Sequence, residues 1–284
     1  MPCCKFALAA GPSVFFRPLS TLEEFVPKQV RGPTAALLGG LQYAVPRGIT
    51  GNSFLNYLVF EAPHVYSLGT LKSEKRRRIK KAANEFVIKP LTNAEEFKEL
   101  VHPIYMDFYE RTRYSVGSAR RQSRHFFQWA DALFKLPGIL ILGAYQIDKL
   151  MGISTSFLYN DTLICATLLC TAESLRRYLP DLMLHAIRES ASVCPGLARI
   201  YQGMYHGNTS LDAFYLERGA RILRKPASLC LNPLARIMVK RLRPTQYRRL
   251  LGVLSDAEMK WVAGESVRVS QGNWKAVDGA HVLD

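Results

Sequence analysis

The chain has 284 residues, 48% of them hydrophobic and 21% charged, a composition that is typical of globular proteins and excludes an intrinsically disordered one. No uncharged apolar stretch reaches the roughly 18 residues that span a membrane, so the sequence predicts no transmembrane helix. With 38 Lys and Arg against 23 Asp and Glu, the formal net charge is +15, which favours an anionic partner.

The first 70 residues are rich in Gly and Pro and contain short apolar runs. We expect an irregular or partial α/β segment there, with a short helix near residues 21–26 and one or two strands. Residues 71–84 follow as a basic helix and residues 87–90 as a short strand. The next helix starts at a predicted capping box, Thr92 to Glu95, and carries an apolar stripe with helical spacing.

A helix over residues 123–134 ends before Pro137 and Gly138. The pattern then changes to three strands joined by short turns, followed by alternating helices and strands. The predicted order is β-β-β-α-β-α-β, over residues 139–145, 150–159, 162–170, 180–193, 198–205, 209–218 and 221–230. The third strand is almost wholly apolar, which predicts a central position with both faces covered. This order predicts a mixed sheet with helices on its faces.

Four residues in and next to the last predicted helix have a distinctive spacing: Asn208, then Leu211, Tyr215 and Gly219 at three, seven and eleven positions later. This stretch resembles a late motif of the GNAT acyltransferase superfamily, although Ala220 replaces the aromatic that often follows the glycine. The resemblance implies a GNAT-like α/β fold with a mixed, mostly antiparallel central sheet flanked by helices.

The resemblance also implies roles for two of these residues. Tyr215 would lie near the donor sulfur and protonate the leaving thiolate, and Asn208 would touch the pantetheine arm of the cofactor. A phenol can supply that proton as a general acid. The structural alternative is that Tyr215 is a core aromatic beside Phe214 and that Gly219 only ends the helix.

The loop after the central strand corresponds to the pyrophosphate-binding loop of GNAT enzymes, whose amides cradle phosphate at a helix N-terminus. Here the Arg is kept as Arg177, but Pro180 and Leu182 replace both small residues, and Asp181 adds negative charge. Thr171, Arg176 and Arg177 are the cofactor-binding candidates, because the two arginines can contact phosphates directly. The alternative is a solvated loop.

Several features resemble the FemAB and CelD-like branch of the superfamily. They are the lost glycines, the basic helix at residues 71–82, Gly143, Gly152 and the element from Phe214 to Gly219. The resemblance covers residues 71–231. We therefore expect three parts: residues 1–70, a GNAT-like domain over residues 71–232, and a basic C-terminal extension over residues 233–284.

Two further residues are candidates for deprotonating the incoming amine, which is nucleophilic only as the free base. Glu173 follows the central strand, and His206 ends the next strand. Both can instead be ordinary surface residues. The histidines His64, His102, His125 and His185 have no ligand spacing, so no metal site is expected. None of the six cysteines forms a CxxC pair, which favours a reducing cytoplasm.

Positive charge is concentrated in residues 72–81, 111–124 and 236–249. The last segment alternates basic and apolar residues, so an anionic membrane surface, an RNA backbone or packing against the core are all open. A location in the cytoplasm is expected, with attachment to the inner membrane face as an option.

The expected function is N-acylation of a small amine or amino acid, with acyl-CoA or acyl carrier protein as donor and no permanently bound cofactor. One alternative is an aminoacyl transferase that uses aminoacyl-tRNA, with residues 72–81 contacting phosphates. A second alternative is a non-catalytic GNAT-like domain that only binds RNA, lipid or protein.

Overall fold

The computed structural model describes residues 6–8, 14–18, 22–112, 118–207 and 210–263. Its strands form one sheet in the order β1-β2-β3-β10-β4-β9-β8-β7-β6-β5. Among the described strands only β2–β3 and β8–β9 run parallel, and the other neighbours are antiparallel. The sequence therefore predicted the sheet type correctly.

The strands are bounded as follows: β1 Phe6–Leu8, β2 Phe15–Pro18, β3 Gly40–Ala44, β4 Ser53–Glu61, β5 Val87–Pro90, β6 Ile139–Gln146, β7 Lys149–Tyr159, β8 Thr162–Cys170, β9 Arg199–Met204 and β10 Arg221–Leu231. The helices are α1 Ser73–Ala83, α2 Ala94–Thr112, α3 Ser123–Leu133, α4 Ala172–Leu175, α5 Leu179–Ser192, α6 Ser210–Leu216, α7 Pro233–Leu242, α8 Pro244–Leu250 and α9 Asp256–Met259. Between residues 71 and 231 nearly every predicted element is confirmed.

Three local expectations were wrong. The side chain that caps α2 is Asn93, whose Oδ1 accepts from the amides of Glu95 and Glu96, so Thr92 is not the cap. The loop after β8 contains the short helix α4. No helix forms over the described residues 22–26, because Glu24 instead makes a β-bridge with Ala44.

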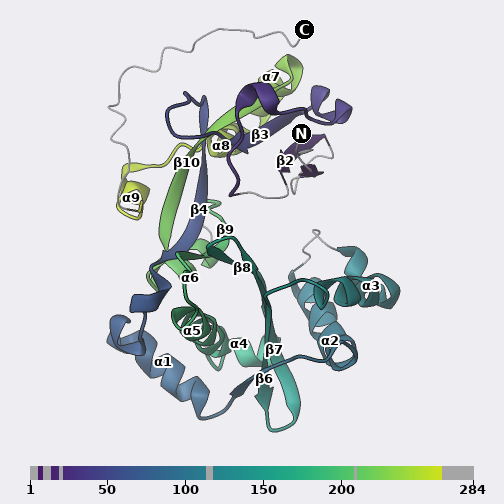
Figure 1. The fold of residues 1–284 in the computed structure, drawn as a ribbon, viewed down its shortest axis with the longest axis vertical. Coiled ribbons are helices and arrows are strands. Elements are labelled where there is room, and N and C mark those ends of the chain that lie inside the picture. The colour runs from purple at the N-terminus through teal and green to yellow at the C-terminus, as the bar shows by residue number, and fades with distance from the viewer. Residues whose placement is uncertain (1–5, 9–13, 19–21, 113–117, 208–209, 264–284) are drawn as a thin grey trace.

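Helices cover the lower sheet on both faces, as Figure 1 shows. On one face α1, α5 and α6 pack on Leu58, Ile200 and Ile222 in the main core. On the other face α2 and α3 pack on Ile153 and Leu169. Successive side chains of a strand point to opposite faces, so both faces of β8 are buried, as its apolar sequence predicted.

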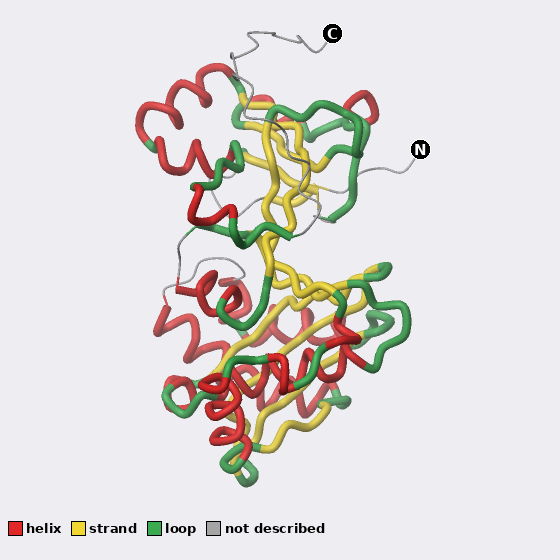
Figure 2. Tube along the Cα trace, turned by 90° about the vertical axis from the view of Figure 1, so that its left-hand side faces the viewer, coloured by secondary structure: helices red, strands yellow, loops and turns green. Residues whose placement is uncertain are grey.

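The molecule is elongated, with two lobes joined by the long strands β4 and β10 (Figures 1 and 2). The upper lobe contains β2, β3, α7 and α8, and the lower lobe contains the helices that flank β5–β8. β4 belongs to the first 70 residues, yet it lies between β10 and β9 in the middle of the sheet. The sheet therefore runs across the predicted boundary at residues 70 and 71.

Candidate functional site

The parallel strands β8 and β9 pair only at their first residues and then diverge. Their last paired residues are Ile164 and Tyr201. β8 continues to Cys170 and β9 to Met204, with β7 and β4 as their respective outer partners. The facing backbone edges of residues 165–170 and 202–204 are therefore not paired to each other, and we call this unpaired stretch between two central strands the gap.

Both strands also carry a β-bulge where they part. In β8 the register with β7 skips Ala166, and in β9 the register with β4 skips Gln202. A bulge bends its strand and ends regular pairing, and bulges are common beside active sites. The two bulges give a local physical cause for the divergence of β8 and β9, a cause that hydropathy patterns do not reveal.

Several buried polar atoms on the two neighbours of β8, β9 and β7, have no hydrogen-bond partner. They include both side-chain polar atoms of Gln202 on β9, Oε1 and Nε2, and the hydroxyls of Ser154 and Thr155 on β7. Buried polar groups are normally paired, and leaving one unpaired costs about 1–3 kcal/mol. A bound polar ligand is one way to satisfy the Gln202 amide, which the sequence alone did not single out.

Tyr215 lies beside the unpaired part of β8. Its side chain is 6% exposed and packs in the main core, and the thiols of Cys165 and Cys170 on β8 are close enough to influence its ionisation. Burial, and then the two thiols, raise the pKa of the phenol above its ordinary value of 10.0. The phenol is therefore protonated at neutral pH.

The far end of β8 is fixed by two contacts from α2. Arg111 donates from Nη2 to the carbonyl of Cys170 at 3.1 Å. The hydroxyls of Tyr105 and Thr167 are 3.4 Å apart. Sequence reasoning did not select Arg111 or Tyr105 for this site, because nothing local indicates that α2 packs against a strand about 60 positions later.

Glu173 and Arg177 are placed together, on the side of β8 that faces β6. The Glu173 carboxylate is 3.4 Å from Arg177 Nη1. Arg177 also pairs with Glu85 at 2.6 Å and donates to Gln146 on β6 at 2.9 Å. Thr171 caps α4 through Ser174. The structure thus engages Arg177 in contacts within the protein, whereas no ion pair is recorded for the exposed Arg176 among the described residues.

The N-terminal turn of α5 differs from a glycine-rich phosphate loop. Tyr178 precedes it in a left-handed conformation (φ 64°), and Pro180 occupies the first turn. The Tyr178 ring lies 5.2 Å from the guanidinium of Arg78 and 5.7 Å from the ammonium of Lys81, both on α1. Three cationic residues, Arg78, Lys81 and Arg176, therefore surround this helix end.

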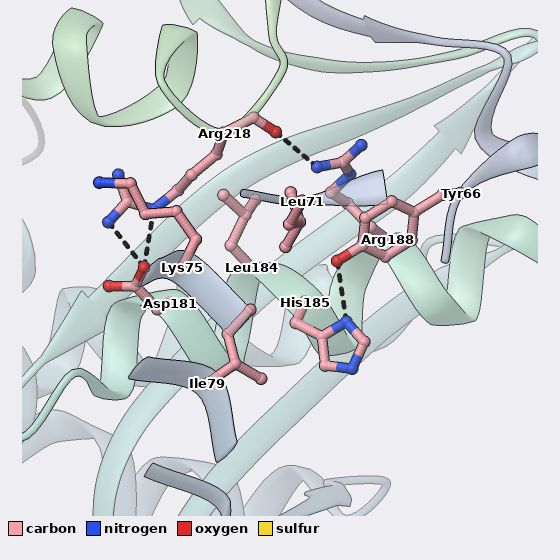
Figure 3. Close-up of a pocket in the computed structure, with 9 residues that line it drawn as sticks. All are labelled: Tyr66, Leu71, Lys75, Ile79, Asp181, Leu184, His185, Arg188 and Arg218. Atoms are coloured by element: carbon pink, nitrogen blue, oxygen red, sulfur yellow. Dashed lines mark hydrogen bonds and ion pairs between the residues drawn. The ribbon is translucent and has the colours of Figure 1, made fainter. Parts of the chain in front are cut away.

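Asp181 is neutralised inside the protein. Its Oδ1 accepts from Arg218 Nε at 2.9 Å and Nη2 at 2.7 Å, and both side chains are about nine-tenths buried or more. Figure 3 shows this pair beside Arg188, whose Nη1 donates to the carbonyl of Arg218. The expectation that Asp181 repels an anion at α5 is therefore corrected, because Arg218 balances its charge.

His206 is exposed at the end of β9, and its backbone amide donates to the carboxylate of the buried Asp212 in α6. The neighbouring Tyr205 donates to Glu258 at 2.6 Å. Asn208 lies outside the described residues. His206 and Glu173 follow the same ends of two parallel strands, but Glu173 is tied to Arg177 on the β6 side. The structure does not bring Tyr215, Glu173 and His206 together through any recorded contact.

The described residues contain no cluster of three or more His, Cys, Asp or Glu side chains suited to a metal ion. The reactive or polar side chains described at the gap are the buried phenol of Tyr215, the thiols of Cys165 and Cys170, and the unpaired side-chain amide of Gln202. Burial raises the pKa of Cys165 to about 11 and that of Cys170 to about 12, so neither thiol is poised as a nucleophile.

No protein-family model and no curated protein sequence matches the chain. Solved structures do. The C-terminal domain (DUF2156) of a putative lysylphosphatidylglycerol synthetase from Agrobacterium fabrum has a TM-score of 0.50 and 10% identity, over 71% of this chain and 72% of that one. FemX has a TM-score of 0.49 and 9% identity, over 69% of this chain and 66% of that one.

A Bacteroides thetaiotaomicron protein of unknown function is also similar, with a TM-score of 0.47 and 12% identity over 64% of this chain. The match spans 61% of that protein's length. At such identities the likeness concerns the fold alone. The fold is GNAT-like, as the spacing around Tyr215 led us to expect.

Proposed function

We propose that the protein transfers an acyl group from a thioester donor, acyl-CoA or acyl carrier protein, to the amine of a small molecule or amino acid. The observation that carries this proposal is the gap between β8 and β9, with the protonated phenol of Tyr215 beside it. The donor's acyl and pantetheine portion would occupy the gap, where the Gln202 amide lacks a partner.

The proposed reaction is an acyl exchange. The amine nitrogen attacks the thioester carbonyl carbon, a C–N bond forms, and the C–S bond breaks. The departing thiolate takes a proton from the Tyr215 phenol, and the proton lost by the amine returns to the phenolate through water or a base. His206 is the proposed base, because it is exposed just after the last residue of β9. Glu173, which follows β8, is the second candidate.

The cations around the start of α5 support an anionic donor. Arg176, just after α4, and Lys81 and the Glu74-paired Arg78 on α1 can contact phosphates with their side chains. This would compensate for the one backbone N–H donor that Pro180 removes. In this proposal Arg176 binds the donor, Arg177 positions α4, and Thr171 contributes by ending β8 and capping that helix.

An aminoacyl-tRNA donor is the second candidate function. It is favoured by the non-glycine turn at Tyr178 and by the exposed cations of α1, including Arg77 and Lys80. A nucleic-acid backbone is held mainly by such cations, and binding of this kind weakens steeply with salt.

Thermal-shift titrations distinguish the two donors, because a ligand that binds the native state raises its apparent stability. Separate titrations would use acetyl-CoA, a long-chain acyl-CoA and tRNA. The proposal predicts a shift with an acyl-CoA, and about 2.7 kcal/mol of stabilisation at a ligand concentration 100 times Kd. A mass-spectrometric screen of acyl-CoA with pooled amines would then identify the N-acylated product.

Salt and one variant provide the controls. A shift with tRNA alone that is lost at high salt would favour the aminoacyl transferase. The variant Arg176→Gln should weaken acyl-CoA binding, whereas the matched variant Arg221→Gln, exposed on β10, should not. Stabilisation without any product in the screen would contradict the enzymatic proposal and favour a binding protein.

A further inference from the structure

Helix α7 lies at the end of the upper lobe (Figure 1). It exposes large apolar side chains to solvent. Leu234 and Leu242 are each 72% exposed, and Ile237 and Met238 are more than half exposed. These positions recur at three, four and eight residues, so they form a stripe along the helix. Single exposed apolar residues are ordinary, but a contiguous patch marks an interaction site.

The patch continues onto the neighbouring turn. Asn232, which caps α7, donates from its side-chain Nδ2 to the carbonyl of Leu37 at 2.8 Å. Its backbone N–H donates to the carbonyl of Gly39. Leu37 and Leu38 therefore lie next to the start of α7, and they are 59% and 71% exposed. We call these six residues, with α7 itself, the apical patch: Leu37, Leu38, Leu234, Ile237, Met238 and Leu242.

Positive charge borders the apical patch without any acidic residue on the same helix. Arg236, Lys240, Arg241 and Arg243 are all exposed, and residues 232–255 contain no Asp or Glu. No ion pair is recorded for these four cations among the described residues. Long cationic side chains can extend past an apolar surface and keep their charge in the headgroup region.

Helix α1 shows that charge alone does not make such a surface. It carries more Lys and Arg than α7, but its apolar residues Ile79 and Ala82 are buried, and it exposes no large apolar side chain. Its Lys75 and Arg78 are held by Glu217 and Glu74. The combination of exposed apolar and unpaired basic residues is characteristic of helices that lie in a membrane interface.

We propose that the apical patch docks the protein on an anionic lipid bilayer, with α7 lying in the plane of the interface. The leucines, Ile237 and Met238 would enter the acyl boundary, and the four cations would contact anionic headgroups. None of the helices in the described ranges is long and apolar enough to cross the bilayer. The proposal concerns a surface separate from the gap and does not depend on the proposed function.

Charge favours lipid over a second copy of the chain as the occupant of the patch. A symmetric dimer through α7 would bring two sets of four cations together without acids on that helix to balance them. Like charges that face each other across an interface are destabilising. An anionic bilayer attracts the same cations.

Vesicle co-sedimentation of the full chain tests the proposal. We expect binding to vesicles of phosphatidylcholine mixed with phosphatidylglycerol, little binding to phosphatidylcholine alone, and weaker binding as salt increases. The double variant Leu234→Ser and Leu242→Ser should reduce the partition coefficient on the order of tenfold or more. The double variant Lys240→Gln and Arg241→Gln should reduce it roughly thirtyfold.

Two variants provide matched controls. Val193→Ser removes an exposed apolar residue at the end of α5, and the pair Lys72→Gln with Lys80→Gln removes two exposed cations near and on α1. Both should bind vesicles like the parent, and all variants should keep the parent's circular dichroism spectrum and thermal midpoint. Equal losses for the control and patch variants would overturn the proposal. A second outcome would also overturn it: the parent fails to bind vesicles and forms a dimer in analytical ultracentrifugation, and the double leucine variant abolishes that dimer.

Discussion

Replacing Arg218 by Met should lower the free energy of unfolding by about 3–5 kcal/mol, because it leaves the buried Asp181 carboxylate without its counter-ion. Asp181 and Arg218 are 5% and 6% exposed, and their atoms approach to 2.7 Å. The pair joins the first turn of α5 to the residues just after α6, the helix with Tyr215. Chemical denaturation monitored by circular dichroism measures the effect.

The double variant Asp181→Leu with Arg218→Met removes both charges and should recover much of the loss, since a buried ion pair can be replaced by apolar side chains at little cost. Arg199→Ala is the surface control, because Arg199 lies 3.9 Å from Asp161 with both side chains substantially exposed. It should change stability by less than about 1 kcal/mol. If Arg218→Met and Arg199→Ala lowered the free energy of unfolding by the same amount, the buried ion pair would contribute no more to stability than an exposed one.

Replacing Tyr215 by Phe should reduce turnover by about 10²–10⁴-fold, the usual contribution of a positioned general acid. Stability should change by only about 1 kcal/mol, because the ring stays and a single hydroxyl is lost. Because burial raises the pKa of this phenol, it stays protonated throughout the neutral range and beyond its ordinary 10.0. Turnover by the parent should therefore show no alkaline decline from Tyr215 ionisation below about pH 10.

Tyr43→Phe is the matched control for this prediction. Tyr43 is also a buried tyrosine whose phenol pKa is raised by burial, but it lies on β3 in the upper lobe. It should show a similar small change in stability and unchanged turnover. Full activity of Tyr215→Phe would exclude the phenol as the acid and leave it as a core aromatic, the reading that its packing also allows.

The elements between residues 71 and 231 were predictable because their apolar periodicity is local and strong. The confirmed bounds of α1, β5, β7 and α5 differ from the expected ones by only a residue or two. The cap of α2 was assigned to the wrong residue because Thr92 and Asn93 are adjacent, and either side chain can accept from the first amides of a helix. A four-residue helix such as α4 is too short for any periodic signal.

Long-range placement was not predictable in the same way. β10 lies between β3 and β4, which precede it by more than 160 residues, and no local pattern indicates those partners. The pair of Asp181 and Arg218 joins positions 37 apart in the sequence. The motif around Tyr215 led to the correct fold, whereas the unpaired Gln202 and the contact from Arg111 became visible only in three dimensions.

Photochemical cross-linking tests the central claim most directly, namely that the donor occupies the gap between β8 and β9. The protein would be irradiated with an acyl-CoA analogue that carries a diazirine in its acyl chain, and the labelled peptides would be mapped by mass spectrometry. The account predicts labels on residues 165–170 and 202–204, competed away by the unmodified acyl-CoA. Competable labels confined to other surfaces, such as the cleft of about 260 Å³ beside Asn160 and Arg199, would contradict it.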